Sequence, residues 1–451
     1  METVVFQSTN GKSPSVDLRQ ALLAGQAPDR GLYLPARYPQ LSAETIAGFS
    51  QKPYYEIAFQ ILRLYTAGIM EESALRTLCH DAYNFEVPLE PVYDRVHVLR
   101  LDRGPTASFK DFAARMMARW LGLFLGQSHQ QLTILTATSG DTGSAVASAF
   151  HGVPGIRVLV LFPFAEVSRR QRLQMTTLGD NIRTIAVDGK FDDCQALVKR
   201  AFSDPSLASI PLSSANSINI GRLLPQSVYY FYAASRLAKP GEPIVFSVPS
   251  GNFGDMMGAV IARSMGLPIK RLVVPVNGND AFPNFLASGN YQKIDPSRNC
   301  ISNAMNVGHP SNLARLVAVF GGQMDETGCI HRPPDLMAMR RDLFSVTVSD
   351  DLTRSTIQEA WAKHRLLLEP HGAVGWQGFL QYIRQESFLD EPAAILETAH
   401  PAKFPDEIEK ILKFVPEVPP ALAALDHREE RFDRLAVDYS AFRAYLRGHY
   451  G

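Results

Sequence analysis

The chain has 451 residues, of which 46% are hydrophobic and 20% are charged, which is typical of a folded globular protein and excludes a disordered one. Lysine plus arginine and aspartate plus glutamate number 45 each, so a formal net charge of zero gives no overall field to attract nucleic acid or an anionic membrane. This length exceeds what one hydrophobic core usually supports, so we expect two or three packed subdomains and a small-molecule substrate.

Residues 1–95 combine turn signals with helical periodicity. Asn10-Gly11-Lys12 and Ala27-Pro28-Asp29-Arg30-Gly31 are turn sequences. One face of a helix is indicated by the spacing of Tyr55, Ala58, Phe59, Leu62 and Tyr65. We therefore expect a mainly helical N-terminal domain over residues 1–95.

From about residue 97 onward, short runs rich in β-branched residues alternate with longer amphipathic segments. We predict strands at residues 132–136, 158–162, 182–187, 244–248 and 272–276. This alternation is typical of a parallel sheet with crossover helices, and therefore of an α/β fold.

Domain boundaries follow from the same pattern. We expect a small mobile α/β domain at residues 131–234 and a large domain made of residues 96–130 and 235–451. Residues 280–345 have weaker periodicity and are interpreted as an insertion or lid rather than as sheet core. After residue 420 the chain is charged and helical in pattern, which indicates a packed or solvated tail.

Two glycine-containing loops directly follow predicted strands, at the edge where parallel sheets bind ligands. Ser250, Gly251, Asn252, Phe253 and Gly254 offer a hydroxyl and consecutive backbone amides, which suit a phosphate dianion. The alternative is a glycine-rich turn that binds nothing.

The other loop contains Ser139, Gly140, Asp141, Thr142 and Gly143. Asp141 would repel an anion unless its side chain turns away to cap the following helix. We therefore expect Asp141 to act at least partly as a helix cap, with the hydroxyls of Ser139 and Thr142 facing a ligand.

Lys110 lies in Ser108-Phe109-Lys110-Asp111, at the start of a segment with helical spacing of apolar residues. A positive helix dipole and partial burial lower the pKa of an amine and favour its nucleophilic form. A surface lysine is the alternative for this residue taken alone. Together with the two loops it supplies the amine, the polar anion loop and the phosphate cradle that pyridoxal phosphate requires.

The combination resembles the fold-type II pyridoxal phosphate enzymes, whose fold is similar to that of the tryptophan synthase β subunit. Within them it resembles the threonine synthases, particularly the longer microbial and fungal form. The similar segments extend over nearly the whole chain and include Ala27–Pro35, Gly104–Asp111, Asn216–Gln226 and Glu397–Phe404. The resemblance implies two sheet-containing subdomains with the cofactor between them.

By this resemblance Lys110 is the catalytic Schiff-base lysine, Ser250–Gly254 bind the cofactor phosphate, and Thr398 bonds the pyridine nitrogen. The implied reaction converts O-phospho-homoserine and water into L-threonine and phosphate. The residues implied for the substrate phosphate are Thr106, Ser217, Asn219 and Arg222, and those for its α-carboxylate are Ser139, Asp141 and Thr142.

Four further residues lie in family-like segments, namely Asp111, His371, His400 and Lys403. Each has a structural alternative as a cap, a core histidine or a solvated lysine. The chain also departs from the family: Asp102-Arg103 stands where Phe-His is common, Ser108 replaces a frequent alanine, and the Glu369–Gly375 segment has a glycine where threonine is usual. None of these changes removes the cofactor-binding set.

Two other functions stay open at this point. A related phospho-lyase would release 2-oxobutyrate and ammonia, and a non-catalytic descendant would sense a metabolite. We expect no nucleic-acid, membrane or metal partner and a monomer or homodimer. The four separated cysteines and the N-terminal sequence, read as lacking a secretory leader, predict a reduced cytoplasmic protein.

Overall fold

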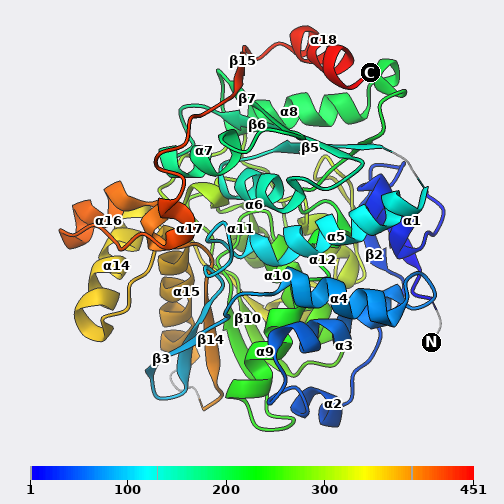
Figure 1. Ribbon diagram of the computed structural model, residues 1–451. Coiled ribbons are helices and arrows are strands. Elements are labelled where there is room, and N and C mark those ends of the chain that lie inside the picture. The colour runs from blue at the N-terminus through cyan, green and yellow to red at the C-terminus, as the bar shows by residue number, and fades with distance from the viewer. Residues whose placement is uncertain (1–2, 129–130, 387–389) are drawn as a thin grey trace.

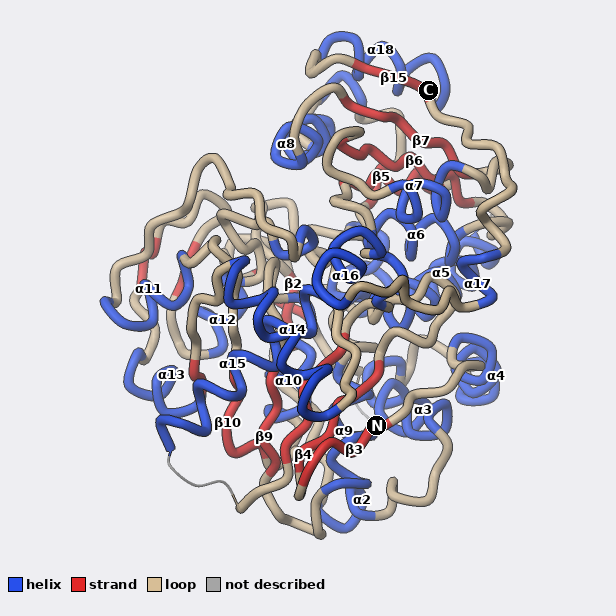
Figure 2. Tube along the Cα trace, turned by 90° about the vertical axis from the view of Figure 1, so that its left-hand side faces the viewer, coloured by secondary structure: helices blue, strands red, loops and turns tan. Residues whose placement is uncertain are grey.

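The computed structural model describes residues 3–128, 131–386 and 390–451. Its two main sheets, one of six strands and one of five, are each covered by helices on both faces. Both views show these sheets apart from each other, with helices α5 and α6 in the region between them (Figures 1 and 2). The predicted α/β fold is confirmed. No helix in the described part of the chain combines the length and the apolar character needed to cross a bilayer.

The N-terminal region is mainly helical, as predicted. Its helices are α1 (Leu18–Ala24), α2 (Ala43–Ala47), α3 (Tyr54–Thr66) and α4 (Glu72–Ala82), and a short antiparallel pair is formed by β1 (Phe6–Ser8) and β2 (Tyr33–Pro35). Asp17 is the N-cap of α1 and forms a capping box: its side chain accepts from the backbone amide of Gln20, and the Gln20 side chain accepts from the backbone amide of Asp17. Helix α3 buries Ala58, Phe59, Leu62 and Tyr65 of the predicted apolar face, whereas Tyr55 is only partly buried against the core.

The larger sheet has the strand order β13-β10-β9-β14-β4-β3. Only β3 runs antiparallel to its neighbour β4. The strands are β3 (Leu89–Tyr93), β4 (Val96–Arg100), β9 (Ile244–Ser247), β10 (Ile269–Val273), β13 (Leu343–Phe344) and β14 (Ala393–Glu397).

Side chains alternate between the two faces of this sheet. Val245 and Ile395 pack with α14 and α15 on one face, whereas Phe246 and Leu396 join the main core on the other. The sheet is therefore buried on both sides, as expected for parallel strands. The helices of this part are α5 (Lys110–Ser128), η2 (Ile220–Arg222), α9 (Ser227–Leu237), α10 (Gly254–Ser264), α14 (Asp350–His364), α15 (Pro370–Glu386), η4 (Pro401–Lys403), α16 (Pro405–Leu412) and α17 (Pro420–Ala423).

The smaller sheet has the order β15-β7-β6-β5-β8 and is parallel throughout. Its strands are β5 (Leu132–Ala137), β6 (Ile156–Pro163), β7 (Ile182–Val187), β8 (Leu212–Ser213) and β15 (Asp433–Leu435). Its helices are α6 (Asp141–Phe150), α7 (Arg169–Thr176), α8 (Phe191–Phe202), η1 (Pro205–Leu207) and α18 (Tyr439–Tyr450). Helices α8 and α18 share a core with one face of this sheet, separate from the main core on its other face.

The predicted strands at 132–136, 158–162, 182–187 and 244–248 are confirmed. The fifth covers Ile269–Val273 rather than 272–276. It begins earlier because Lys270 and Arg271 break the apolar run without ending the strand, and it ends at Val273. The interpretation of residues 280–345 needs correction, since β13 from this segment extends the larger sheet beside β10. The remaining elements there are α11 (Ala281–Ser288), η3 (Asn303–Met305), α12 (Leu313–Val319), β11 (Gln323–Met324), β12 (Ile330–Arg332) and α13 (Leu336–Asp342).

The C-terminal segment returns to the smaller sheet. Strand β15 pairs with β7, with Asp433 opposite Ile185 and Leu435 opposite Val187. Helix α18 then buries Phe442 and Leu446 against the face that carries α8. The tail is thus packed, and it packs against residues far earlier in the chain.

Candidate active site

A pocket of about 100 Å³ lies at the carboxyl ends of β5, from the smaller sheet, and of β9 and β14, from the larger sheet. Parallel sheets bind ligands at this edge. Most of the predicted cofactor and substrate residues line it, namely Lys110, Ser139, Asp141, Thr142, Ser217, Arg222, Ser250, Gly251, Asn252, Phe253, Gly254 and Thr398. Thr106 and Asn219 are not among its lining residues.

The side chains of Thr106 and Asn219 are used by the fold itself. Asn219 donates from Nδ2 to the carbonyl oxygens of Leu22 and Ser214, at 2.9 and 3.0 Å. Thr106 donates from its hydroxyl to Oδ1 of Asp111, at 2.7 Å. These two residues hold the loops around the pocket, and the structure does not bring their side chains to its wall.

Lys110 is the first residue of α5, and its side chain is only 13% exposed. The loop before it is fixed by a hydrogen bond from the Phe109 amide to the carbonyl oxygen of Thr398, at 2.9 Å. Burial lowers the pKa of Lys110, and the nearby cations of Lys403 and Arg222 lower it further. A buried amine with a lowered pKa at the pocket wall is suited to covalent attachment of an aldehyde.

Asp141 lies between two lysines. Its Oδ2 is 3.7 Å from Nζ of Lys110, and its Oδ1 is 2.6 Å from Nζ of Lys403, whose side chain is fully buried. Burial alone would raise the pKa of Asp141, but the two ammonium groups outweigh it and hold that pKa well below its usual range. Gln171 Nε2 donates to the same Oδ1 at 3.0 Å, so the carboxylate is fixed in place.

One expectation and one alternative from the sequence are wrong at this point. Asp141 does not cap α6, because the residue before the helix is Gly140, and the side chain of Thr138 accepts from the Gly140 and Gly143 amides instead. Lys403 is not a solvated lysine, because it is buried and also donates to the carbonyl oxygen of Thr106 at 3.0 Å.

The loop Ser250–Gly254 has the geometry of an anion cradle. Phe253 adopts a left-handed conformation with φ of 62°, and within the described part of the chain the amides of Gly251, Asn252 and Phe253 have no hydrogen-bond acceptor. A Cβ at Gly251 would lie 2.7 Å from Cα of Met305, so only glycine fits there. Successive free amides in a turn bind phosphate oxygens, and these residues therefore fit the phosphate of pyridoxal phosphate.

A second group of donors comes from the segment that contains Ser217 and Arg222, which also lines the pocket. The hydroxyl oxygen of Ser217 accepts from Nδ2 of Asn252 and of Asn312, at 2.9 and 3.0 Å, which leaves its own hydrogen available. Arg222 is 3% exposed and donates to the carbonyl oxygen of Ala215 at 2.6 Å, while its Nε has no partner in the described chain. Burial lowers the pKa of Arg222 to about 10, which still leaves it cationic.

Sequence reasoning missed Asp255, which is a further polar residue that lines the pocket. Asp255, in the first turn of α10, accepts from the hydroxyls of Tyr229 and Tyr230 at 2.5 and 2.7 Å. Burial raises the pKa of Asp255 to about 6. His371 also lines the pocket; its Nδ1 is 2.6 Å from Glu369, which places the proton on Nδ1 and directs Nε2 toward the pocket loop.

The two sheets, the buried lysine and the phosphate cradle define a pyridoxal phosphate enzyme of fold type II. The family described as "Pyridoxal-phosphate dependent enzyme" matches residues 77–396. Families described as "Threonine synthase N terminus" and "Threonine synthase, C-terminal" match residues 5–83 and 372–446.

Comparison with individual proteins agrees with this class. The chain is 37% identical to a threonine synthase of Pseudomonas aeruginosa over 98% of both chains, and 40% identical to that of Haemophilus influenzae over 96% of both. Among solved structures, the pyridoxal-phosphate-bound threonine synthase of Brucella melitensis is 36% identical with a TM-score of 0.90, over 99% of this chain and 100% of the other. The yeast threonine synthase is 30% identical with a TM-score of 0.89, over 99% and 98%. The chain belongs to the threonine synthases, which are pyridoxal-phosphate-dependent lyases.

Proposed function

We propose that this chain converts O-phospho-homoserine and water into L-threonine and inorganic phosphate. The observation that carries the proposal is the presence of two sets of anion-binding donors around one buried amine. The amides of Gly251 to Phe253 form one group, and Arg222 with Ser217 forms the other. A cofactor and a substrate that each carry a phosphate require both.

Pyridoxal phosphate, when bound, supplies an electron sink that stabilises negative charge at the α-carbon of the substrate. Lys110 would be its covalent attachment point, the loop Ser250–Gly254 would hold its phosphate, and the Thr398 hydroxyl, which lines the pocket, would bond its ring nitrogen. The Thr398 carbonyl accepts from the Phe109 amide, so the ring partner and the lysine loop are positioned together.

Lys110 would carry the protons of the reaction. Once the substrate amine has displaced it, its Nζ would accept the proton from the α-carbon, pass that proton on to the bound cofactor, and then accept one from the β-carbon as the γ-phosphate departs. Arg222 would stabilise the departing phosphate, because an ionised hydrogen-bond donor in a buried site acts strongly on a dianion. The γ-carbon then takes up a proton and becomes a methyl group, water adds its hydroxyl at the β-carbon, and return of a proton to the α-carbon completes L-threonine. We also propose that the released phosphate acts as a base for this water.

Asp141 and Lys403 would position Lys110 rather than react. The carboxylate is held by Lys403 and Gln171 on one oxygen, and its other oxygen faces Nζ of Lys110 at 3.7 Å. Ser139 and Thr142 line the same pocket and would bind the α-carboxylate of the substrate. Thr106 and Asn219, whose side chains bond within the fold, would act on the substrate only through the loops that they hold.

Product analysis tests the proposal. Purified, cofactor-loaded protein with O-phospho-homoserine should release L-threonine and phosphate in equal amounts. Release of 2-oxobutyrate and ammonia alone would assign the phospho-lyase reaction instead. Cofactor binding without any turnover would indicate a metabolite sensor, and Lys110→Ala should abolish the cofactor's absorbance near the visible edge in either case.

The remaining expectations belong to the same proposal. We propose that the protein is cytoplasmic and is a monomer or homodimer, and light scattering would measure its oligomeric state. All four cysteines are free thiols in the structure, which agrees with a reducing compartment. We retain residues 1–95 as an N-terminal domain, 96–130 and 235–432 as the large domain, and 131–234 as a small domain that moves toward the large one when substrate binds. Residues 433–450, expected in the large domain, go with the small one instead, because β15 and α18 pack on its sheet.

A further inference from the structure

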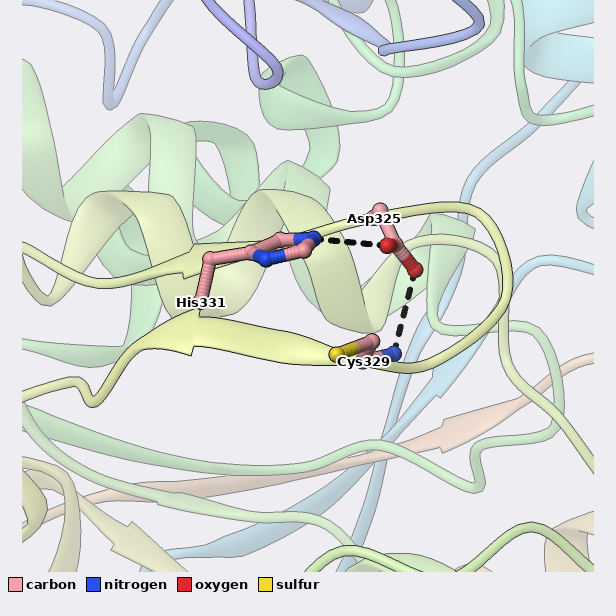
Figure 3. A group of neighbouring side chains, drawn as sticks. All are labelled: Asp325, Cys329 and His331. Carbon is pink, nitrogen blue, oxygen red and sulfur yellow. Dashed lines mark hydrogen bonds and ion pairs between the residues drawn. The ribbon is translucent and has the colours of Figure 1, made fainter.

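A hairpin outside the active-site pocket brings three potential metal-binding side chains together. Strands β11 and β12 pair antiparallel, and the turn between them is closed by hydrogen bonds from the Asp325 amide to the Cys329 carbonyl and from the Gly328 amide to the Asp325 carbonyl, at 3.0 and 3.1 Å. The ligand atoms of Asp325, Cys329 and His331 all lie within 4.8 Å of one another. Figure 3 shows the imidazole of His331 directed at the Asp325 carboxylate, with the Cys329 side chain beside them.

The backbone explains why these residues meet. Cys329 and His331 are two residues apart on an extended stretch, so their side chains leave the same face of the hairpin. Asp325 stands at the end of the facing strand. Its Oδ1 accepts from the amides of Thr327 and Cys329, at 2.9 and 3.1 Å. This anchoring leaves Oδ2 to face the imidazole Nε2 at 2.7 Å.

We propose that Asp325, Cys329 and His331 form a binding site for a borderline-soft divalent ion such as Zn²⁺, with the fourth coordination position open to water. Thiolate, imidazole and carboxylate together are the donors that Zn²⁺ accepts, and they exclude the hard ions Mg²⁺ and Ca²⁺, which take oxygen ligands. Binding places the ion where Nε2 and Oδ2 now share a hydrogen bond. It requires a neutral imidazole and releases the thiol proton.

The surroundings support an accessible, oriented site. The Asp325 side chain is 21% exposed and that of His331 is 53% exposed, so an ion reaches both from solvent. The amide bonds to Oδ1 are outer-shell contacts of the kind that orient a ligating carboxylate. The neighbouring Glu326 is engaged elsewhere, in an ion pair with Arg30 at 3.4 Å and, through its carbonyl oxygen, with His309 Nε2 at 3.1 Å.

The location gives the ion a structural role. Asp325 also lines a cavity of about 900 Å³. Gln195, Asn216 and Asn252 belong both to this cavity and to the active-site pocket. An ion bound by the hairpin would join its two strands by side-chain ligation and so fix this wall of the cavity. A search of the sequence for paired cysteines does not find this site, because the three residues form the mixed pattern Asp-x₃-Cys-x-His.

Titration of the full-length, cofactor-loaded protein with Co²⁺ tests the proposal, after reduction of the thiols and removal of the reductant. We expect one Co²⁺ to bind per chain. The complex should show the absorption bands of a four-coordinate ion in the red part of the visible spectrum and a sulfur-to-cobalt charge-transfer band, and all of these bands should disappear when Zn²⁺ is added. Cys329→Ser should remove the charge-transfer band, and Cys329→Ser and His331→Gln should each weaken binding at least about tenfold.

Cys300→Ser is the matched control, because Cys300 is the other thiol that is not buried and it lies outside the cluster. This variant should bind Co²⁺ with the wild-type spectrum and affinity. The proposal is overturned if the wild-type protein shows no saturable Co²⁺ binding. It is equally overturned if Cys329→Ser leaves the spectrum and the affinity unchanged.

Discussion

Lys403→Met tests the electrostatic arrangement around the reacting amine most directly. The substitution keeps the length of the side chain and removes the cation that lies 2.6 Å from Oδ1 of Asp141. At an effective dielectric constant of about 20, two unit charges at this separation attract by about 6 kcal/mol. Part of this is offset by the cost of burying both charges, so removal of one partner of a buried pair costs about 3–5 kcal/mol in stability.

Loss of Lys403 also changes the pKa of Lys110. Lys403 lowers the pKa of Lys110 and Asp141 raises it, so in the variant that pKa should rise. A higher pKa means that a higher pH is required for the amine to attach the cofactor. The pH at which the cofactor's visible band appears should therefore move upward, independently of any turnover measurement.

Urea unfolding of the cofactor-free protein measures the stability, with Lys410→Met as the matched control. Lys410 is exposed on α16, and its substitution should change the free energy of unfolding by less than about 0.5 kcal/mol. The double variant Asp141→Asn/Lys403→Met should be more stable than Lys403→Met alone, because it removes the buried carboxylate that would otherwise keep only the more distant Lys110, at 3.7 Å, as a cation partner. An unfolding free energy of Lys403→Met within about 1 kcal/mol of wild type, with the pH of cofactor attachment unchanged, would refute the reasoning.

Three further predictions concern the anion groups and a buried acid. Arg222→Met should lower kcat/KM for O-phospho-homoserine at least about tenfold in steady-state assays while the cofactor band is retained, because one charged hydrogen bond contributes about 1.5–3 kcal/mol. Gly251→Ala should weaken cofactor binding in absorbance titrations, since the added Cβ would lie 2.7 Å from Cα of Met305. Burial raises the pKa of Asp255 to about 6, so the folded state binds a proton more tightly than the unfolded state, and wild-type stability should fall as pH rises from about 4 to about 6. Asp255→Asn should remove this decline and be more stable at pH 8 by up to about 3 kcal/mol in denaturant unfolding; equal pH profiles would count against the buried charge.

The sequence predicted those parts of the fold that depend on local pattern. Strands β5, β6, β7 and β9 were predicted because runs of β-branched residues are bounded by turn signals, and the loops after β5 and β9 followed from their glycines. Strand β15 carries only the short sequence Asp433-Arg434-Leu435, which has no strand period of its own. It forms because β7 offers an unpaired edge.

The site shows the same limit. Lys110 and the Ser250–Gly254 loop were found because their chemistry is visible in contiguous residues. The roles of Asp141 and Lys403 depend on a contact between distant parts of the chain, and Lys403 alone is indistinguishable from a surface lysine. The cap predicted for Asp141 is wrong because the hydroxyl of Thr138, two residues before the N-cap residue Gly140, accepts from the Gly140 and Gly143 amides.

Because β15 lies near the C-terminus, the edge of β7 that it covers stays unpaired until synthesis of the chain is almost complete. Ribosomes release the chain from its N-terminus, so residues 132–213 emerge long before the strand that covers the outer edge of β7 is made. Until then that edge presents a row of unpaired amide and carbonyl groups, which other nascent chains can pair with. A nonsense codon near position 430 would leave this vulnerability permanent, and such a truncated product should precipitate even though every pocket residue is present.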